Sequence, residues 1–291
     1  MLQGSICALV TPFCDGAFDG AAYEKFVGWQ IDQGTEGLVP CGTTGEAATL
    51  SFDEHFEVVR VCVDQAAGRV PVIAGCGSND TRSAIKNLQM AKALGADAGL
   101  LVPPYYNRPS QEGIFRHFEA IVGECDLPIV LYNVPGRTAS DIAVGTLERL
   151  MTLPGIVGIK DATGDLARVT QQRAVTPDDF CQLSGNDDLA LPFNVLGGVG
   201  CISVTANIAP ELCAEFQAAC KNGDFQEARE IHERLFPLHK ALFADASPGP
   251  AKYALSRIMP DFPSDLRLPM TWPSEEAQRQ VDAGLEHAGI I

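Results

Sequence analysis

The first 222 residues alternate between two kinds of hydrophobic pattern. Short runs that are apolar throughout are separated by longer stretches in which apolar residues recur at helical spacing. The runs that predict strands are 6–10, 37–40, 70–74, 98–102, 128–132, 157–160, 180–183 and 200–204. Strands without polar alternation are typical of a parallel sheet that is covered on both faces. Eight strand–helix units in succession predict an α/β fold, a (β/α)8 TIM barrel, rather than an open doubly wound sheet.

Helix signals lie between these strands and dominate the end of the chain. Examples within the barrel are 21–33, 53–67, 81–94 and 110–124. Asp53, Asp80 and Ser110 are expected to cap helices, because short polar side chains accept hydrogen bonds from the first free backbone N–H groups. After about residue 222 no further strand is predicted. The helices expected there are 225–244, 249–259 and 274–288. The pattern thus predicts a barrel over 1–222 and a C-terminal helical domain over 223–291.

The composition is that of a globular protein with an acidic surface. Of the 291 residues 46% are hydrophobic, and the formal net charge is −16 with a pI near 4.6. Nucleic acid and anionic membranes are poor partners for such a chain, because both repel negative charge. The N-terminus lacks the basic region of a signal peptide, and no apolar run reaches the roughly 20 residues that a membrane helix needs. We therefore expect a cytoplasmic protein.

The cysteines and histidines exclude several kinds of site. The ten cysteines form no Cys-x-x-Cys pair and no ligand spacing for a metal, so Cys7, Cys181 and Cys201 are interpreted as buried, reduced thiols. All five histidines fall in helical stretches, which argues against a His-based triad. The glycine-rich stretch 197–200 precedes a strand, whereas a dinucleotide-binding loop follows one.

Lys160 is the first candidate for chemistry. It ends the apolar strand 157–160 and is followed by the polar turn 161–164. Among the seven lysines, it alone is preceded by several apolar residues. A desolvated amine in such a place can lose its proton and attack a carbonyl carbon. The alternative is a solvated lysine at the surface. The residues at the other strand ends distinguish a nucleophile from a surface lysine, because a nucleophile needs catalytic groups nearby.

Those strand ends supply hydroxyls, phenols and a guanidinium. The second strand leads into Cys41-Gly-Thr-Thr-Gly-Glu46, whose backbone amides suit a carboxylate. Tyr132 ends the fifth strand and is followed five residues later by Arg137, the natural fork for a carboxylate. Catalytic groups of a barrel come from the C-terminal ends of different strands. The set lacks a metal cluster and favours a Schiff base between Lys160 and a keto acid.

Four ordered motifs resemble those of the dihydrodipicolinate synthase family, which shares its scaffold with N-acetylneuraminate lyase. They are Gly42-Thr-Thr-Gly-Glu46, Tyr105-Tyr-Asn-Arg-Pro109, Tyr132-Asn-Val-Pro-Gly-Arg-Thr138 and Gly158-Ile-Lys-Asp-Ala-Thr-Gly164. The resemblance covers the whole chain. It implies a lyase of lysine and diaminopimelate biosynthesis that condenses pyruvate with L-aspartate 4-semialdehyde. It also implies no cofactor and a homotetramer built as a dimer of dimers.

The resemblance assigns roles to eight residues. Lys160 is implied to form the imine and Tyr132 to donate and accept protons. Thr43 and Tyr106 are implied to complete a hydroxyl relay, with Tyr106 reaching across a dimer interface. Arg137 is implied to hold the carboxylate of the semialdehyde. The residues implied to surround bound pyruvate are Thr44, Gly185 and Ile202. One phenol between hydroxyls can protonate a leaving group and later accept a proton.

The resemblance also implies a regulatory L-lysine site between subunits. The positions that would line it are Ala48, Phe52, His55, Asn79, Ser83 and Tyr105. Phe52 stands where the sensitive pattern has histidine, and Ser83 stands where it has a glutamate that would pair the inhibitor's ammonium. These departures predict weak inhibition by L-lysine, or none.

Three alternatives compete with this interpretation. N-acetylneuraminate lyase and 2-keto-3-deoxy sugar acid aldolases share the lysine and the tyrosine, so those two residues do not decide the substrate. Arg137 favours the synthase. A non-catalytic scaffold barrel, or a sensor that binds pyruvate without turnover, would be expected to have a broken relay, yet Thr43, Tyr106, Tyr132 and Lys160 are all present.

Overall fold

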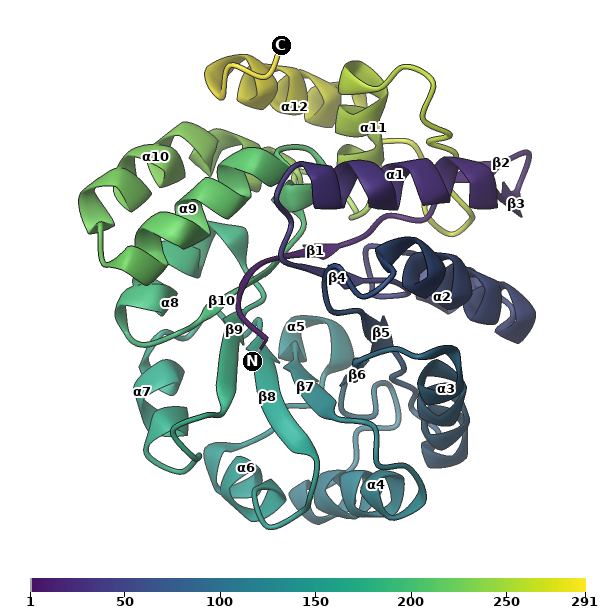
Figure 1. The fold of residues 1–291 in the computed structure, drawn as a ribbon, viewed down its shortest axis with the longest axis vertical. Coiled ribbons are helices and arrows are strands. Elements are labelled where there is room, and N and C mark those ends of the chain that lie inside the picture. Colours follow the sequence, from purple (N-terminus) through teal and green to yellow (C-terminus); the bar gives the residue numbers. More distant parts are fainter. Residues whose placement is uncertain (1) are drawn as a thin grey trace.

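The computed structural model describes residues 2–291 and places eight parallel strands in one barrel (Figure 1). In chain order the barrel strands are β1 (Gly4–Ala8), β4 (Gly37–Val39), β5 (Ile73–Gly75), β6 (Ala98–Leu101), β7 (Ile129–Asn133), β8 (Ile156–Asp161), β9 (Cys181–Ser184) and β10 (Gly200–Ser203). Their order around the barrel is β4-β1-β10-β9-β8-β7-β6-β5. A parallel bridge between Leu38 and Val72 joins the two ends of this sheet. The predicted (β/α)8 barrel is confirmed, and its strand ends differ from the predicted ones by a few residues.

Helices surround the barrel (Figure 1). Those that follow the strands are α1 (Gly20–Asp32), α2 (Phe52–Ala66), α3 (Thr81–Leu94), α4 (Gln111–Glu124), α5 (Pro135–Thr138), α6 (Val144–Leu150), α7 (Ala167–Arg173), α8 (Ala190–Val195) and α9 (Pro210–Asn222). Short 3-10 helices are η1 (Ala47–Thr49), η2 (Asp187–Leu189) and η3 (Thr205–Asn207). Asp80 and Ser110 cap α3 and α4 as predicted. The prediction for α2 was wrong, because Ser51 rather than Asp53 is its cap and forms a reciprocal capping box with Glu54.

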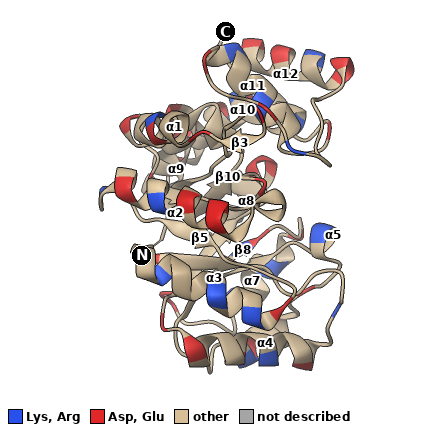
Figure 2. Cartoon of the chain, turned by 90° about the vertical axis from the view of Figure 1, so that its right-hand side faces the viewer, with Lys and Arg blue, Asp and Glu red and all other residues tan. Residues whose placement is uncertain are grey.

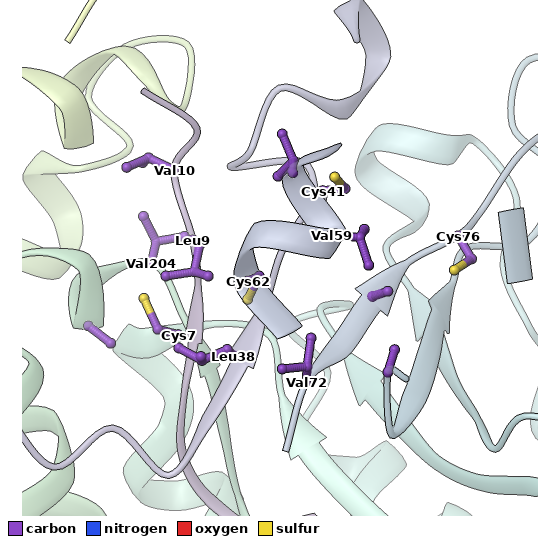
Figure 3. Close-up of a cluster of buried hydrophobic side chains, with 14 of the residues drawn as sticks. Cys7, Leu9, Val10, Leu38, Cys41, Val59, Cys62, Val72, Cys76 and Val204 are labelled. Carbon is purple, nitrogen blue, oxygen red and sulfur yellow. The ribbon is translucent and has the colours of Figure 1, made fainter. Parts of the chain in front are cut away.

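The core has two layers because neighbouring residues of a strand point to opposite faces. Ile6 and Val130 belong to the cluster inside the barrel, together with inward residues of the other strands. Cys7 and Leu131 belong to the larger cluster between the strands and the helices. Figure 3 shows Cys7 of β1 and Cys62 of α2 in this outer layer. Eight of the ten free cysteines are buried, and they include Cys7, Cys181 and Cys201, which were predicted to be buried thiols.

A small hairpin near the N-terminus was not predicted from the sequence. Phe13–Cys14 (β2) and Ala17–Phe18 (β3) pair as a small antiparallel hairpin. Its turn residues Asp15 and Gly16 both have positive φ, the backbone conformation of a tight hairpin turn. The Phe13 side chain is fully buried, so the hairpin also contributes to the core.

Three helices follow residue 222, as predicted: α10 (Phe225–Ala241), α11 (Gly249–Ile258) and α12 (Glu275–His287). α10 packs against α9 and α12, and α11 packs against α12. The division into a barrel over 1–222 and a helical domain over 223–291 stays a prediction.

Charged residues are distributed over the outer helices. Figure 2 shows acidic and basic residues interspersed on α2, α4 and α12, whereas α3 has basic residues only. Among the helices of residues 2–291, none combines the length and the apolar character that crossing a membrane requires.

Candidate active site

Lys160 and Tyr132 are brought together by strand register. Tyr132 on β7 is the direct partner of Lys160 on β8. The Lys160 side chain is buried, and its Nζ lies 4.3 Å from the centre of the Tyr132 ring. Within residues 2–291, Lys160 has no carboxylate partner. A buried amine beside a phenol and without a carboxylate partner is an environment in which a lysine can act as a nucleophile.

A cavity of about 600 Å³ opens at this end of the barrel. Its lining includes Tyr132, Thr43 and Arg137, three of the predicted site residues. Tyr105 and Val134 line it as well, and residues of the C-terminal part, such as Met270, contribute to its wall. The cavity thus lies at the C-terminal ends of the strands, where the barrel fold places active sites.

Gly185 keeps space open beside the lysine. It follows β9, and its N–H donates to the carbonyl of Asp161 at 2.7 Å. A Cβ at this position would lie 3.1 Å from Cε of Lys160 and 2.7 Å from Cβ of Ala162. Any larger residue would therefore push against the nucleophile. Ile202 of β10 is fully buried in the same inner layer.

The loop after β4 presents free backbone donors. The N–H groups of Gly45 and Glu46 turn back to the carbonyls of Gly42 and Thr43, at 3.1 Å each. The N–H groups of Thr43 and Thr44 find no acceptor within residues 2–291. Adjacent free amides form a concavity that suits an anion. The Thr44 side chain is buried, whereas the Thr43 side chain is exposed toward the cavity.

Tyr106 lies apart from the other predicted residues. Its side chain is 89% exposed, its φ is +70°, and it does not line the cavity. Within residues 2–291 no hydrogen bond joins the hydroxyls of Thr43 and Tyr132. The hydroxyl relay therefore stays a prediction.

The residues of the predicted regulatory site are split. Ala48, His55 and Tyr105 line the cavity, together with Phe52, whose ring lies under the ammonium of Lys86 at 3.7 Å. Burial lowers the pKa of His55.

Asn79 and Ser83 do not line the cavity. The hydroxyl and the N–H of Ser83 both donate to Asp80, the N-cap residue of α3. Ser83 therefore already has a hydrogen-bond partner within the helix cap. Asn79 accepts a hydrogen bond from Asn107 through its carbonyl.

Lys252 and Glu46 form a buried ion pair that the sequence analysis missed. Their side chains are 0% and 1% exposed, and Nζ lies 2.5 Å from the carboxylate. Burial lowers the pKa of Lys252, and the Glu46 carboxylate opposes this shift. The sequence did contain a sign that Lys252 is buried, because its neighbours Ala251, Ala254 and Leu255 are apolar residues of α11 that face the core. No group of three or more His, Cys, Asp or Glu side chains within residues 2–291 is placed to hold a metal.

Eight parallel strands, a cavity at their C-terminal ends and a buried, unpaired lysine beside Tyr132 of the cavity wall define an enzyme of the (β/α)8 class. The family model described as "Dihydrodipicolinate synthetase family" matches residues 1–288. The chain belongs to this family, which confirms the resemblance seen in its motifs.

Relatives of known name cover the whole chain. The 4-hydroxy-tetrahydrodipicolinate synthase of Rhizorhabdus wittichii is 62% identical over 290 residues, covering 100% of both chains. The solved structure of the chloride-inhibited dihydrodipicolinate synthase of Acinetobacter baumannii, complexed with pyruvate, is 45% identical, with a TM-score of 0.97 and 100% coverage of both chains. That of the DHDPS of Cyanidioschyzon merolae with lysine bound is 38% identical, with a TM-score of 0.95 and 99% coverage of each.

Proposed function

We propose that the protein condenses pyruvate with L-aspartate 4-semialdehyde to 4-hydroxy-tetrahydrodipicolinate, as the first step of lysine and diaminopimelate biosynthesis. One observation supports this most directly: Lys160 is buried without a counterion and stands in register with Tyr132 beside the cavity. Relatives that bear the name of this enzyme match the chain over its full length.

The proposed reaction begins with the amine of Lys160. In its neutral form Nζ attacks C2 of pyruvate, and the carbonyl oxygen leaves as water when the imine forms. Loss of a proton from the methyl carbon gives an enamine, whose carbon attacks the aldehyde of the second substrate. The amino group of that substrate then attacks the imine carbon, closes the ring and releases Lys160. The net result is one new carbon–carbon bond, one new carbon–nitrogen double bond and one water molecule.

The other site residues supply protons and hold carboxylates. We assign the proton transfers to the Tyr132 hydroxyl, which Thr43 and Tyr106 assist. The free amides of Thr43 and Thr44 suit the pyruvate carboxylate, with Gly185 and Ile202 beside it. Arg137 stands at the cavity wall and suits the carboxylate of the semialdehyde.

Covalent trapping tests the nucleophile. Borohydride added with pyruvate should leave a reduced three-carbon adduct on the peptide that contains Lys160. Lys252 is an internal control, because it is buried too but is paired with Glu46. An adduct on Lys252, or none at all, would contradict the mechanism. Faster cleavage of N-acetylneuraminate than condensation of the semialdehyde would contradict the substrate assignment.

The exposure of Tyr106 bears on assembly. Tyr106 is 89% exposed and does not line the cavity of its own chain, so the relay that we propose takes this phenol from a second copy of the chain. We therefore include a homotetramer, built as a dimer of dimers, and a cytoplasmic location in the proposal. Sedimentation of the purified protein tests the assembly, and a monomer with full activity would contradict the role of Tyr106.

Weak inhibition by L-lysine is part of the same proposal. Ser83 brings no charge, and its hydroxyl is bonded to Asp80. Glu54, an acid that could replace the missing one, is paired with Arg267, which lowers the pKa of Glu54 to about 2. Losing a charged partner in a partly buried site costs about a hundredfold in affinity.

An inhibition curve with L-lysine at saturating pyruvate tests this part of the proposal. We expect little inhibition at millimolar L-lysine and a shift to tighter inhibition in Ser83→Glu. Half-inhibition of the unmodified protein well below millimolar would contradict it.

A further inference from the structure

The residues that directly follow Tyr132 and Lys160 form a second pair outside the barrel. Asn133 and Asp161 are register partners on β7 and β8, one position after the two site residues. Because successive residues of a strand alternate between faces, this pair points toward the surrounding helices. Asn133 is 0% exposed and Asp161 is 4% exposed.

One arginine of α7 connects this outer pair to the loop that bears Arg137. The Arg168 side chain lies 3.5 Å from the Asp161 carboxylate and 3.1 Å from that of Asp141. It also donates to the carbonyl of Ile142 at 2.6 Å. Arg168 is therefore in contact with both the end of β8 and the end of the 134–142 loop, and its side chain is only 12% exposed.

Asn133 closes the same network from β7. Its amide nitrogen donates to Asp141 at 2.7 Å, and its amide oxygen accepts from the N–H of Ile142 at 3.1 Å. Three segments thus meet in one network: the strand end with Tyr132, the loop with Arg137 and the strand end with Lys160. Within residues 2–291, no arginine or lysine other than Arg168 forms an ion pair with Asp161 or Asp141.

We propose that Arg168 is a positioning residue, which fixes Arg137 relative to Tyr132 and Lys160 by tying Asp141 and Ile142 to Asp161. This inference rests on the proposed condensation of pyruvate with a semialdehyde. A misplacement of about 1 Å at a reacting group can cost about a hundredfold in rate, so an anchor outside the barrel can control the chemistry inside it.

The network predicts that the two substrates respond unequally to loss of Arg168. Asp161 keeps other partners, since it accepts from Gln172 at 2.6 Å and from the N–H of Thr163 at 2.8 Å. Asp141 is 44% exposed. Without Arg168 its carboxylate still accepts from Asn133, and its backbone carbonyl still accepts from the side-chain amide of Gln111. The strand end with Lys160 loses one contact of 3.5 Å and should stay in place. The loop with Arg137 loses two shorter contacts, of 3.1 Å and 2.6 Å, and should loosen.

Arg168→Met is the central variant, because methionine keeps much of the apolar stem but removes the guanidinium. We expect the KM for the semialdehyde to rise at least about tenfold and kcat to fall, whereas the rate of borohydride-trapped imine formation stays within about threefold. The KM and kcat of Arg168→Lys should lie between those of Arg168→Met and the unmodified protein, since one ammonium can restore one of the carboxylate contacts. Arg173→Met is the matched control: it removes an exposed arginine of the same helix and should behave like the unmodified protein.

Asp141→Asn tests the same loop if Arg168→Met does not fold. It should reproduce the loss that is specific to the semialdehyde, with unchanged imine trapping. The inference is overturned if semialdehyde KM and kcat of the folded variants stay within about twofold of the unmodified protein. It is also overturned if pyruvate trapping and semialdehyde use fall equally, because that pattern marks a general loss of structure. Failure of the proposed function would be visible in the unmodified protein, which would then neither trap pyruvate nor condense the semialdehyde, and Arg168 would have no such role.

Discussion

Replacing Lys252 with methionine should destabilise the protein strongly. Methionine can keep the packing of the lysine stem, whose ammonium lies 4.4 Å from the centre of the Phe13 ring. The change removes the ion pair with Glu46 and the hydrogen bond to the carbonyl of Asp265 at 2.6 Å. The Glu46 carboxylate, 1% exposed, is then left with one donor, the N–H of Arg267 at 3.1 Å.

The magnitude follows from the burial of both partners. Removing one member of a buried ion pair costs about 3–5 kcal/mol, because the remaining charge stays desolvated. That loss lowers the folding equilibrium constant more than about a hundredfold, since 1.4 kcal/mol corresponds to tenfold. The double change Lys252→Met with Glu46→Gln should cost less than the single change, because it leaves no buried charge.

Urea unfolding at pH 7, followed by circular dichroism, measures the effect. Protein concentration must be constant, because assembly contributes to apparent stability. Lys240→Met is the control: Lys240 pairs with Asp188 at 3.2 Å, but its side chain is 62% exposed, so this variant should unfold like the unmodified protein. A loss below about 1 kcal/mol in Lys252→Met would refute the reasoning and show that Glu46 is accommodated without its partner.

Three further predictions concern catalysis and pH. Tyr132→Phe should lower kcat by about 10²–10⁴-fold in a condensation assay, the usual contribution of general acid–base catalysis, and a loss below tenfold would assign the proton transfers to another group. Arg137→Ala should raise the KM for the semialdehyde far more than that for pyruvate, and an equal effect on both would make Arg137 structural. Burial lowers the pKa of His117 to about 4, so the unfolded chain binds a proton first as pH falls below about 6.5, and folding stability decreases from there toward pH 4. The free energy of unfolding should decrease by about 2 kcal/mol between pH 7 and pH 5 because of His117. In His117→Gln, urea unfolding should show a pH dependence that lacks this decrease.

The local pattern of the chain was sufficient for the barrel and for the proximity of Lys160 and Tyr132. A strand that is apolar throughout can be recognised from about five or six consecutive residues. A helix cap such as Asp80 or Ser110 can also be recognised from its immediate neighbours in the sequence. Lys160 and Tyr132 stand at the ends of two such strands. Parallel strands of a barrel bring their C-terminal ends together, so the proximity of these two residues followed from the pattern alone.

Tertiary structure alone decided which charged residues are buried and with which partners. Lys252 and Glu46 are about 200 positions apart, and they meet because α11 packs against the loop after β4. Arg168 reaches Asp141 across the space between α7 and the 134–142 loop. Periodicity reports the face on which a residue lies, whereas the pairing of buried charges depends on segments that become neighbours only when the barrel closes and the C-terminal helices pack against it.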